Sequence, residues 1–255
     1  MKRVLVASFL LVGILLPSAA FPQWNIHVVD DFASYHGPGA ICHDSAGLPH
    51  IAYEGTGYYL RYASWNEVTG WWDIEVTSLY GSAGRCALIL DELDDPHVVY
   101  GDNYCTREGT GAWVFEDFHS GASDGALYLT YDHLDRVVPH VSYYVGYHLW
   151  YAYRDPDTGV WQPEEVDALG TVGTHSSLAV DSAGGIYISY FDSSGGNLKF
   201  AYDDGFDWLI ITVDGLVDYV GEYTSLVLDD AGVPHITYYD ATNDELKHAT
   251  ITLGG

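Results

Sequence analysis

The sequence predicts an all-β chain folded as a five-bladed β-propeller whose blades are four-stranded antiparallel sheets. A short motif recurs five times, at spacings of 43 to 48 residues. Runs of four to seven residues rich in Val, Ile, Tyr and Trp alternate with Gly, Asp, Ser and Asn, which is typical of strands and turns. No stretch after residue 20 shows a sustained helical period. Several near-equal four-strand units in series indicate a propeller.

The first 20 residues predict a secretory signal peptide. Lys2 and Arg3 form a basic start, an apolar run extends over residues 4–16, and small residues follow up to Ala20. We therefore expect cleavage near Ala20 and a secreted or periplasmic product, in which residues 21–255 form one propeller domain. No later run approaches the roughly 18 apolar residues of a membrane helix, so we expect no membrane insertion.

The composition is strongly acidic. The chain has 9 Lys and Arg against 36 Asp and Glu, a formal charge of −27 at pH 7, and loss of Lys2 and Arg3 with the signal peptide makes it more negative. Such a surface repels phosphate backbones and anionic lipid heads, which disfavours nucleic acids and membranes as partners. We expect a monomer that stays soluble outside the cell.

Three cysteines follow the signal peptide: Cys42, Cys86 and Cys105. At most one intramolecular disulfide can form, and the sequence does not select among the three possible pairings. A chain of about 235 residues can build its core without disulfides.

The second strand of each unit carries the clearest repeat. The five copies are AGLPHIAYE (46–54), DDPHVVYGD (94–102), VVPHVSYYV (137–145), GGIYISYFD (184–192) and AGVPHITYYD (231–240). His50, His97, His140 and His235 take equivalent positions, and Tyr187 replaces His in the fourth copy. Equivalent residues of different blades lie far apart around a ring, and both faces of a blade are covered. We therefore expect these His side chains to make buried hydrogen bonds rather than to bind a metal.

The first and fourth strands of each unit also carry a repeated residue. The first strands end at Asp44, Asp91, Asp132, Asp181 and Asp229. We expect these carboxylates to accept hydrogen bonds from turn amides. The fourth strands carry Trp24, Trp72, Trp113, Trp161 and Trp208. We expect these side chains to pack between blades.

The Trp strand is out of step with the other three. The first Trp run, residues 23–30, precedes the first unit, and the fifth unit has no Trp run. The arrangement that completes every blade pairs residues 23–30 with the last blade as its fourth strand. This arrangement closes the ring and hides a sheet edge that would otherwise template aggregation.

The repeat L-x-D-x-x-G-x-P-H-I-x-Y-x-D, followed by L-x-[YF]-A and W-x-I-x-x-V-D, resembles secreted bacterial β-propeller proteins that are loosely grouped with sialidase-type (BNR) repeats. The resemblance covers residues 23–251 and concerns architecture. The Asp-box of true sialidases, S-x-D-x-G-x-x-W, does not occur in this sequence. The resemblance therefore implies a propeller and carries no activity with it.

Residues that vary between the copies are the better candidates for function. In a propeller, the loops that lead into the first strands and those between the second and third strands gather on one face around the axis. These loops present Tyr58, Tyr80, Arg85, Tyr147, His148, His175, Tyr219 and Tyr223. Aromatic rings beside Asp, Asn and Gly suit stacking on sugar rings, while carboxylates accept hydrogen bonds from sugar hydroxyls. We therefore predict that these residues bind a glycan.

Catalytic chemistry has few candidates. Glycoside hydrolysis needs paired carboxylates, and only Asp124 and Glu222 stand close to the starts of first strands, two blades apart. A sialidase would need a cluster of arginines, and only Arg85 enters a first strand. A Ser-His-Asp hydrolase would need a strand–elbow–helix context, which the pattern does not provide.

A calcium ion is the one cofactor that the sequence raises. The segments DSSGGN (192–197) and DATNDE (240–245) carry oxygen ligands at alternating spacings, as hard cations prefer. The candidate ligands are Asp192, Asn197, Asp240, Asn243 and Asp244. Neither segment matches the calcium-loop pattern D-x-[DN]-x-[DN]-G.

The sequence thus predicts a secreted, non-catalytic binding propeller whose ligand is a carbohydrate or a surface glycan. Two alternatives remain open. One is a scaffold that binds an extracellular protein, and the other is a glycoside hydrolase that uses loop carboxylates.

Overall fold

The computed structural model describes residues 25–31, 39–81, 85–203, 205–215 and 217–250. The predicted signal peptide and Trp24 lie outside these ranges. The described residues form nineteen strands and no helix. None of them belongs to a helix that is long and apolar enough to cross a membrane.

The strands fall into five groups, which we call blades 1 to 5. Blade 1 contains β1 (Ala40–His43), β2 (Pro49–Glu54), β3 (Tyr59–Asn66) and β4 (Trp71–Tyr80). Blade 2 contains β5 (Cys86–Leu90), β6 (Pro96–Tyr100), β7 (Asn103–Thr106) and β8 (Val114–Asp117). Blade 3 contains β9 (Ser123–Tyr131), β10 (Val137–Val145), β11 (His148–Arg154) and β12 (Trp161–Asp167). Blade 4 contains β13 (Val172–Val180), β14 (Ile186–Asp192), β15 (Asn197–Asp203) and β16 (Trp208–Asp214). Blade 5 contains β17 (Val220–Leu228), β18 (Pro234–Asp240) and β19 (Glu245–Thr250).

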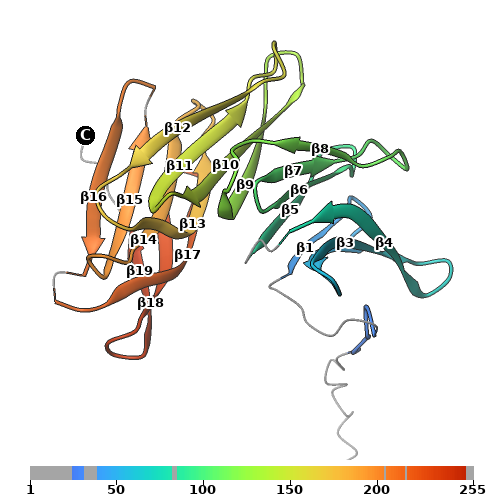
Figure 1. Ribbon diagram of the computed structural model, residues 1–255, viewed down its shortest axis with the longest axis horizontal. Helices are drawn as coiled ribbons and strands as arrows, with labels where there is room; N and C mark the ends of the chain where they lie inside the picture. The colour runs from blue at the N-terminus through green and yellow to red at the C-terminus, as the bar shows by residue number, and fades with distance from the viewer. Residues whose placement is uncertain (1–24, 32–38, 82–84, 204, 216, 251–255) are drawn as a thin grey trace, which may run out of the picture.

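The predicted five-bladed architecture is confirmed. Each blade is an antiparallel meander in which consecutive strands are neighbours, with four strands in blades 1 to 4 and three described strands in blade 5. The first strands lie side by side in the order β1, β5, β9, β13, β17. The blades therefore follow one another in an arc, with blade 1 and blade 5 at its two ends (Figure 1).

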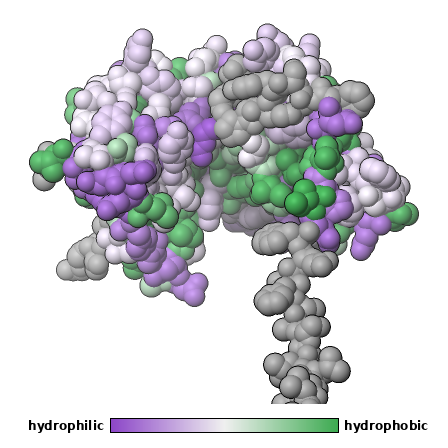
Figure 2. Space-filling view, turned by 90° about the horizontal axis from the view of Figure 1, so that it is seen from below, coloured by the Kyte–Doolittle hydropathy of each residue, from purple (hydrophilic) through white to green (hydrophobic). Residues whose placement is uncertain are grey.

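Ring closure is not shown. Residues 25–31 form no strand and do not pair with β19; they lie against blade 1 instead, where the rings of His27 and Trp65 are 5.0 Å apart. The end blades also expose apolar side chains, since Ile41 of β1 is 68% and Val227 of β17 is 61% exposed. Figure 2 shows a hydrophobic patch on the half of the molecule that holds blade 1.

The repeated Asp residues organise the turns between the first and second strands. In every blade one carboxylate oxygen accepts hydrogen bonds from the backbone N–H groups two and four residues further on. For Asp181 these donors are Ala183 and Gly185, each at 2.8 Å. The other four residues, Asp44, Asp91, Asp132 and Asp229, do the same. The predicted role of these carboxylates is thus confirmed.

The repeated His residues contact side chains of their own blade. The Nδ1 atom of His140 meets the hydroxyl of Tyr151 on β11 at 2.6 Å, and its Nε2 atom meets Thr130 Oγ1 at 2.8 Å. The contact of Nδ1 with a third-strand side chain recurs in His50–Tyr62, His97–Tyr104 and His235–His248. In blade 4, Tyr187 donates to Asp181 at 2.8 Å instead. This recurrence supports a packing role.

The hydrophobic core lies between the blades. One cluster joins Leu149 and Tyr151 of blade 3 to Ile188 and Tyr190 of blade 4, all at most 3% exposed. Trp side chains at the fourth strands pack against these clusters. The ring of Trp208 in blade 4, for example, lies 5.7 Å from that of Tyr151 in blade 3. Trp113 and Trp161 make the matching contacts with Tyr62 and Tyr104.

A buried polar contact fixes each blade against the next. The fourth residue of the His motif is Tyr in all five copies. Tyr190 donates to the carboxylate of Asp167, at the end of the preceding blade's fourth strand, at 2.7 Å. Lys199 of β15 donates to the same carboxylate at 2.8 Å. Asp167 and Lys199 are only 4% and 8% exposed, so the charges neutralise each other away from water.

The other described junctions use variants of this contact. Tyr238 and Lys247 donate to Asp214 at 2.8 and 3.3 Å. His119 replaces the carboxylate at the end of blade 2, where its Nδ1 lies 2.8 Å from the hydroxyl of Tyr143 and its ring packs on Trp150. Tyr100 donates to Glu54 at 2.9 Å and to the carbonyl of Gly81.

We predict that the folded chain loses stability on acidification already at pH values above those at which carboxylates usually titrate. Burial lowers the pKa of His140 to about 4 because it disfavours the charged imidazolium. The unfolded chain, with a His pKa of about 6.5, binds more protons, so stability is lost as the pH falls from 6.5 towards 4. At pH 5 this loss should be about 2 kcal/mol relative to pH 7, measured by urea unfolding.

Two variants test the assignment of this pH dependence. His140→Gln should flatten the dependence between pH 7 and pH 5. His133→Gln, at an exposed turn position, should leave it unchanged. Equal slopes for His140→Gln and the parent chain would contradict the prediction.

The junction between blades 3 and 4 gives a second prediction. Burial alone would raise the pKa of Asp167, but hydrogen bonds from Lys199, the Leu169 amide and Tyr190 hold it below its usual value. Asp167→Ala removes the nearer of the two carboxylates around the buried Lys199 ammonium, leaves Asp192 at 3.8 Å, and takes the acceptor from the Tyr190 hydroxyl. The free energy of unfolding should therefore fall by about 3 kcal/mol. Glu164→Ala, at an exposed position of the same strand, should change it by less than about 0.5 kcal/mol.

Candidate functional site

Three first strands begin with the same irregular stretch. Pairing with the second strand shifts register around residues 124, 175 and 223 of β9, β13 and β17. Asp124, His175 and Tyr223 adopt left-handed backbone conformations there, with φ of 55°, 56° and 56°. Bulges of this kind redirect a side chain and are frequent beside active sites. Side chains other than glycine rarely hold such φ values, and clusters of them mark functional positions.

These three residues and Arg85 form a continuous row of contacts, which we call the axial cluster. Arg85 Nη1 lies 3.5 Å from Asp124 Oδ1. The other carboxylate oxygen of Asp124 accepts a hydrogen bond from the backbone N–H of His175. The imidazole of His175 stacks on the ring of Tyr223, with centroids 4.4 Å apart. The row crosses blades 2, 3, 4 and 5 at the starts of their first strands.

The axial cluster leaves polar groups available. The side chain of Arg85 is 37% exposed, and its second contact, with the carbonyl of Ser176, is long at 3.5 Å. The Nδ1 atom of His175 is buried and has no hydrogen-bond partner among the described residues. Tyr223 is 68% exposed, while Phe191 lies behind His175 with ring centroids 6.2 Å apart. The cluster therefore presents an aromatic face beside a guanidinium and a carboxylate.

Two glycines make the backbone path possible. Gly173 and Gly221 precede His175 and Tyr223 by two residues and have φ of 105° and 107°. A Cβ atom at either position would lie 2.7 Å from a Cα atom of the preceding blade, that of Leu149 or Leu198. The first strands can approach the preceding blade this closely only without a side chain at these positions.

A second group of aromatic residues lies on blade 1. Tyr80, at the end of β4, is 65% exposed and meets the rings of Tyr58 and Tyr59 at 6.2 and 5.5 Å. Tyr58 also has a left-handed backbone, with φ of 63°. The structure thus brings the predicted residues Tyr58 and Tyr80 together and adds Tyr59, which the sequence did not single out.

The remaining predicted ligand residues do not join the row of contacts that forms the axial cluster. Tyr219 packs edge-on against Phe191 at 5.1 Å and so stands next to the axial cluster. Tyr147 is 66% exposed in the turn between β10 and β11. His148 is paired with Glu165 at 2.6 Å on the surface of blade 3.

The two candidate catalytic carboxylates do not share a strand pair. Asp124 lies on β9 and Glu222 on β17, with β13 between them. Asp124 is engaged by Arg85 and by the amide of His175. Glu222 lies opposite Tyr239 in the sheet of blade 5.

The predicted calcium ligands are engaged by donors from their own turns and by lysines. Asp192 accepts hydrogen bonds from Ser194 Oγ and the Gly195 amide. Asp240 accepts from Asn243 and forms an ion pair with Lys247 at 2.6 Å, and these contacts hold the pKa of its carboxyl well below the usual range. The described residues contain no group of three or more His, Cys, Asp or Glu side chains arranged to hold a metal ion.

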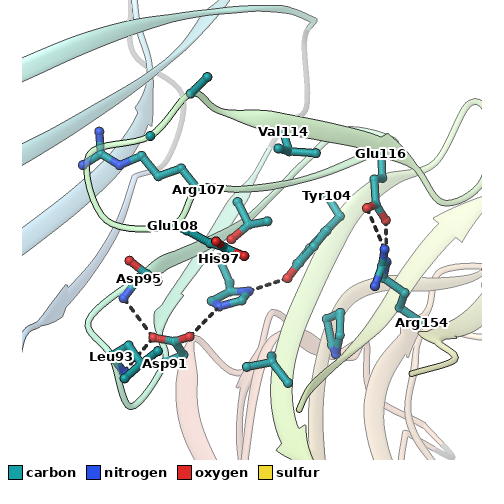
Figure 3. A pocket seen from close by; sticks show the side chains of 15 residues that line it. Asp91, Leu93, Asp95, His97, Tyr104, Arg107, Glu108, Val114, Glu116 and Arg154 are labelled. Atoms are coloured by element: carbon teal, nitrogen blue, oxygen red, sulfur yellow. Dashed lines mark hydrogen bonds and ion pairs between the residues drawn. The ribbon is translucent and has the colours of Figure 1, made fainter. Parts of the chain in front are cut away.

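A cleft of about 880 Å³ opens between blades 2 and 3 (Figure 3). It lies beside β7 and β8, which have four residues each, whereas β11 and β12 have seven. His97, paired with Asp91 and Tyr104, lies at its wall, and Arg154 holds Glu116 through two hydrogen bonds. These groups pair with one another, and the His–Tyr contact recurs in blades 1 and 3, so it belongs to the repeat rather than to this cleft. The axial cluster, whose backbone is strained and whose polar atoms are partly free, is therefore the better candidate site.

The three cysteines carry free thiols. Burial raises the pKa of Cys42 and Cys86 to about 11. The Cys86 thiol lies 3.0 Å from the carbonyl of Ala52 in the neighbouring blade. None of the three possible pairings is therefore formed.

Comparisons with known proteins support the fold. No family model and no curated protein matches the chain. An ulvan lyase of polysaccharide lyase family PL25, bound to a GlcA-containing saccharide, is similar over 84% of this chain and 68% of that one, with 13% identity and a TM-score of 0.59. AofleA from Arthrobotrys oligospora is similar over 85% and 68%, with 12% identity and a TM-score of 0.52. The extracellular domain of the one-component system BT4673 from B. thetaiotaomicron is similar over 88% and 28%, with 12% identity and a TM-score of 0.50. At these identities the likeness concerns the fold alone.

The glycine path into the axial cluster gives a prediction. Gly221→Ala adds a Cβ atom against the Leu198 backbone at an already left-handed position, so it should destabilise the chain by about 2–4 kcal/mol. Gly232→Ala is the matched control, because its φ is 75° but no atom lies within 4 Å of an added Cβ. That variant should lose about 1 kcal/mol. If the two variants lost the same free energy of unfolding in urea, the close approach of Gly221 to Leu198 would not limit the side chain at this position.

Proposed function

We propose that this chain is a secreted carbohydrate-binding propeller whose ligand contacts the axial cluster. The observation that carries the proposal is the convergence of Arg85, Asp124, His175 and Tyr223 from four blades, three of them on left-handed backbone. Each such backbone costs about 1–3 kcal/mol unless the surrounding structure imposes it. Packing alone does not need three different residue types at this one position of the repeat.

The chemistry of the cluster suits a sugar ring. Tyr223 offers a broad exposed face for the C–H groups of a pyranose, and His175 supports this ring from behind. Asp124 accepts hydrogen bonds from hydroxyls, and the free N–H groups of Arg85 donate to sugar oxygens. Small-molecule sites commonly combine an apolar or aromatic lining with a few such polar groups.

The choice of glycan class follows from charge. The chain carries −27 at pH 7, and only one cation lies in the cluster. A polyanionic glycan would be repelled on approach. We therefore expect neutral glycans as ligands. The similar ulvan lyase is described as a polysaccharide lyase bound to a saccharide, which agrees with a carbohydrate ligand but does not identify one.

A glycan array with the fluorescently labelled chain tests the proposal. A neutral hit should be followed by titration of that glycan and a measurement of tryptophan fluorescence. Tyr223→Ala should weaken binding at least tenfold, since it removes the stacking face. Tyr147→Ala is the matched control, because Tyr147 is 66% exposed with a left-handed backbone but lies outside the cluster.

The same experiments separate the alternatives. A blank array, or equal loss of affinity in Tyr223→Ala and Tyr147→Ala, would overturn glycan binding at the axial cluster and leave the protein scaffold as the better interpretation. Turnover of aryl glycosides that disappears in Asp124→Asn would instead identify a glycoside hydrolase.

A further inference from the structure

We propose that residues 25–30 are the fourth strand of blade 5 and that they bind along the outer edge of β19, which closes the propeller ring. The surface concerned is the free edge of β19 together with the exposed face of blade 5. The occupant is a named segment of the same chain. Four features of the described residues point to this arrangement.

The first feature is the position of Asp30. Its carboxylate accepts hydrogen bonds from Tyr53 at 3.0 Å and from Arg61, on β2 and β3 of blade 1. Asp167 meets Tyr190 and Lys199 of blade 4 in the same way, and Asp214 meets the corresponding pair in blade 5. Asp167 and Asp214 each end the fourth strand of the preceding blade. Asp30 therefore holds the position of a fourth-strand terminus that precedes blade 1 in the ring.

The second feature is the position of His27, three residues earlier. At two other junctions, the residue three after the Trp position of the fourth strand is Glu, as His27 is three after Trp24, and this Glu pairs with an Arg near the end of the next blade's third strand. These pairs are Glu75–Arg107 and Glu116–Arg154. By the repeat, the corresponding pair at blade 1 is His27 and Trp65, and their rings lie 5.0 Å apart. Two separate contacts thus place the segment in the same register.

The third feature is a buried donor without a partner. Trp113 Nε1 donates to Glu75 and Trp161 Nε1 donates to Glu116, each at 3.0 Å across a junction. At blade 1 the donor is Trp72, whose Nε1 is buried and, like that of Trp208 in blade 4, lacks a partner among the described residues. The residue that corresponds to the two Glu acceptors there is His27, and a ring nitrogen of His can accept this bond.

The fourth feature is the unfinished state of blade 5. Within the described residues its sheet has three strands, and β19 pairs with β18 alone. Leu246 at its edge is 82% exposed, whereas the equivalent Leu198 in blade 4 is fully buried. Ile26 in the proposed strand is 92% exposed. An open strand edge beside exposed apolar side chains readily pairs with another strand.

The repeat fixes the register of the proposed pairing. In blades 1 to 4 the residue two after the Trp position lies opposite the same repeat position of the third strand. These pairs are Ile74–Ala63, Phe115–Cys105, Pro163–Ala152 and Ile210–Ala201. In blade 5 the rule places Ile26 opposite Ala249. It also places Asn25 opposite Thr250, as Leu209 lies opposite Tyr202.

Disulfide trapping in the full chain tests this register. Ile26→Cys with Ala249→Cys and, separately, Asn25→Cys with Thr250→Cys should form a bridge under mild oxidation. The two pairs alternate in hydrogen-bonding geometry, so one has the closer Cβ separation that a disulfide needs. Peptide mapping by mass spectrometry distinguishes the new bridge from the native thiols. Each reduced variant is first shown to keep the circular dichroism spectrum of the parent.

The matched control is Ile26→Cys with Glu245→Cys. Glu245 lies on the same strand, four residues from Ala249, and is therefore about 13 Å away along β19. A loosely moving segment would bridge to either position. We expect at least a tenfold faster bridge for a predicted pair than for the control, within the monomer.

Three results would overturn the proposal. The first is no bridge in either predicted pair. The second is a bridge that forms as fast in the control. The third is a bridge found only between two chains, which would mean that a second copy supplies the strand.

Discussion

The structure depends on a tyrosine hydroxyl that is buried against an acceptor of the neighbouring blade. Apolar contact between two sheets is non-directional, so it does not by itself fix how far one blade slides or turns against the next. The Tyr190 hydroxyl and the Lys199 ammonium meet on one carboxylate of Asp167 and define a single offset. If one blade were displaced against the other, a buried charge or hydroxyl of this contact would lose its partner, at a cost of several kcal/mol.

The other junctions use different residues, but in each of them a Tyr hydroxyl of the motif contacts a polar group across the junction. At the junction between blades 2 and 3, His119, which follows β8, takes the place of the carboxylate, and Trp150, which packs on the imidazole, takes the place of the cation. Strand β4 of blade 1 does not end in an acidic residue, and Tyr100 of blade 2 instead donates hydrogen bonds to Glu54 and to a backbone carbonyl. The conserved partner is the Tyr in every copy, so the repeat tolerates changes in the acceptor more readily than changes in the donor.

Firm junctions explain how the start of each first strand can hold a strained conformation. The left-handed backbones of Asp124, His175 and Tyr223 persist because the blades on both sides leave them little freedom. The close approach of Gly173 and Gly221 to the preceding blade belongs to the same constraint. The residue that follows each glycine by two positions is free to vary in type, and this variation gives the axial cluster its mixed chemistry.

The sequence predicted the turns, the strands and the number of blades, because these follow from local signals. Asp followed by Gly, alternating apolar residues and a motif that recurs every 43 to 48 residues are all visible within one unit. The sequence also predicted which loops hold variable residues, and Arg85, Asp124, His175 and Tyr223 were all among its candidates.

The tertiary structure decided which of these residues meet. Tyr147 and His148 were candidates on the same grounds, in a loop expected on the same face as the axial cluster, yet they lie on the surface of a single blade. The tyrosine of the motif was plain in all five copies, but its partners stood in other units, 23 and 24 residues away for Tyr53 and Tyr238. Contacts between blades join positions that no local period connects. Strand and turn could therefore be predicted from the sequence by itself, whereas the junctions and the site could be seen only in the folded arrangement.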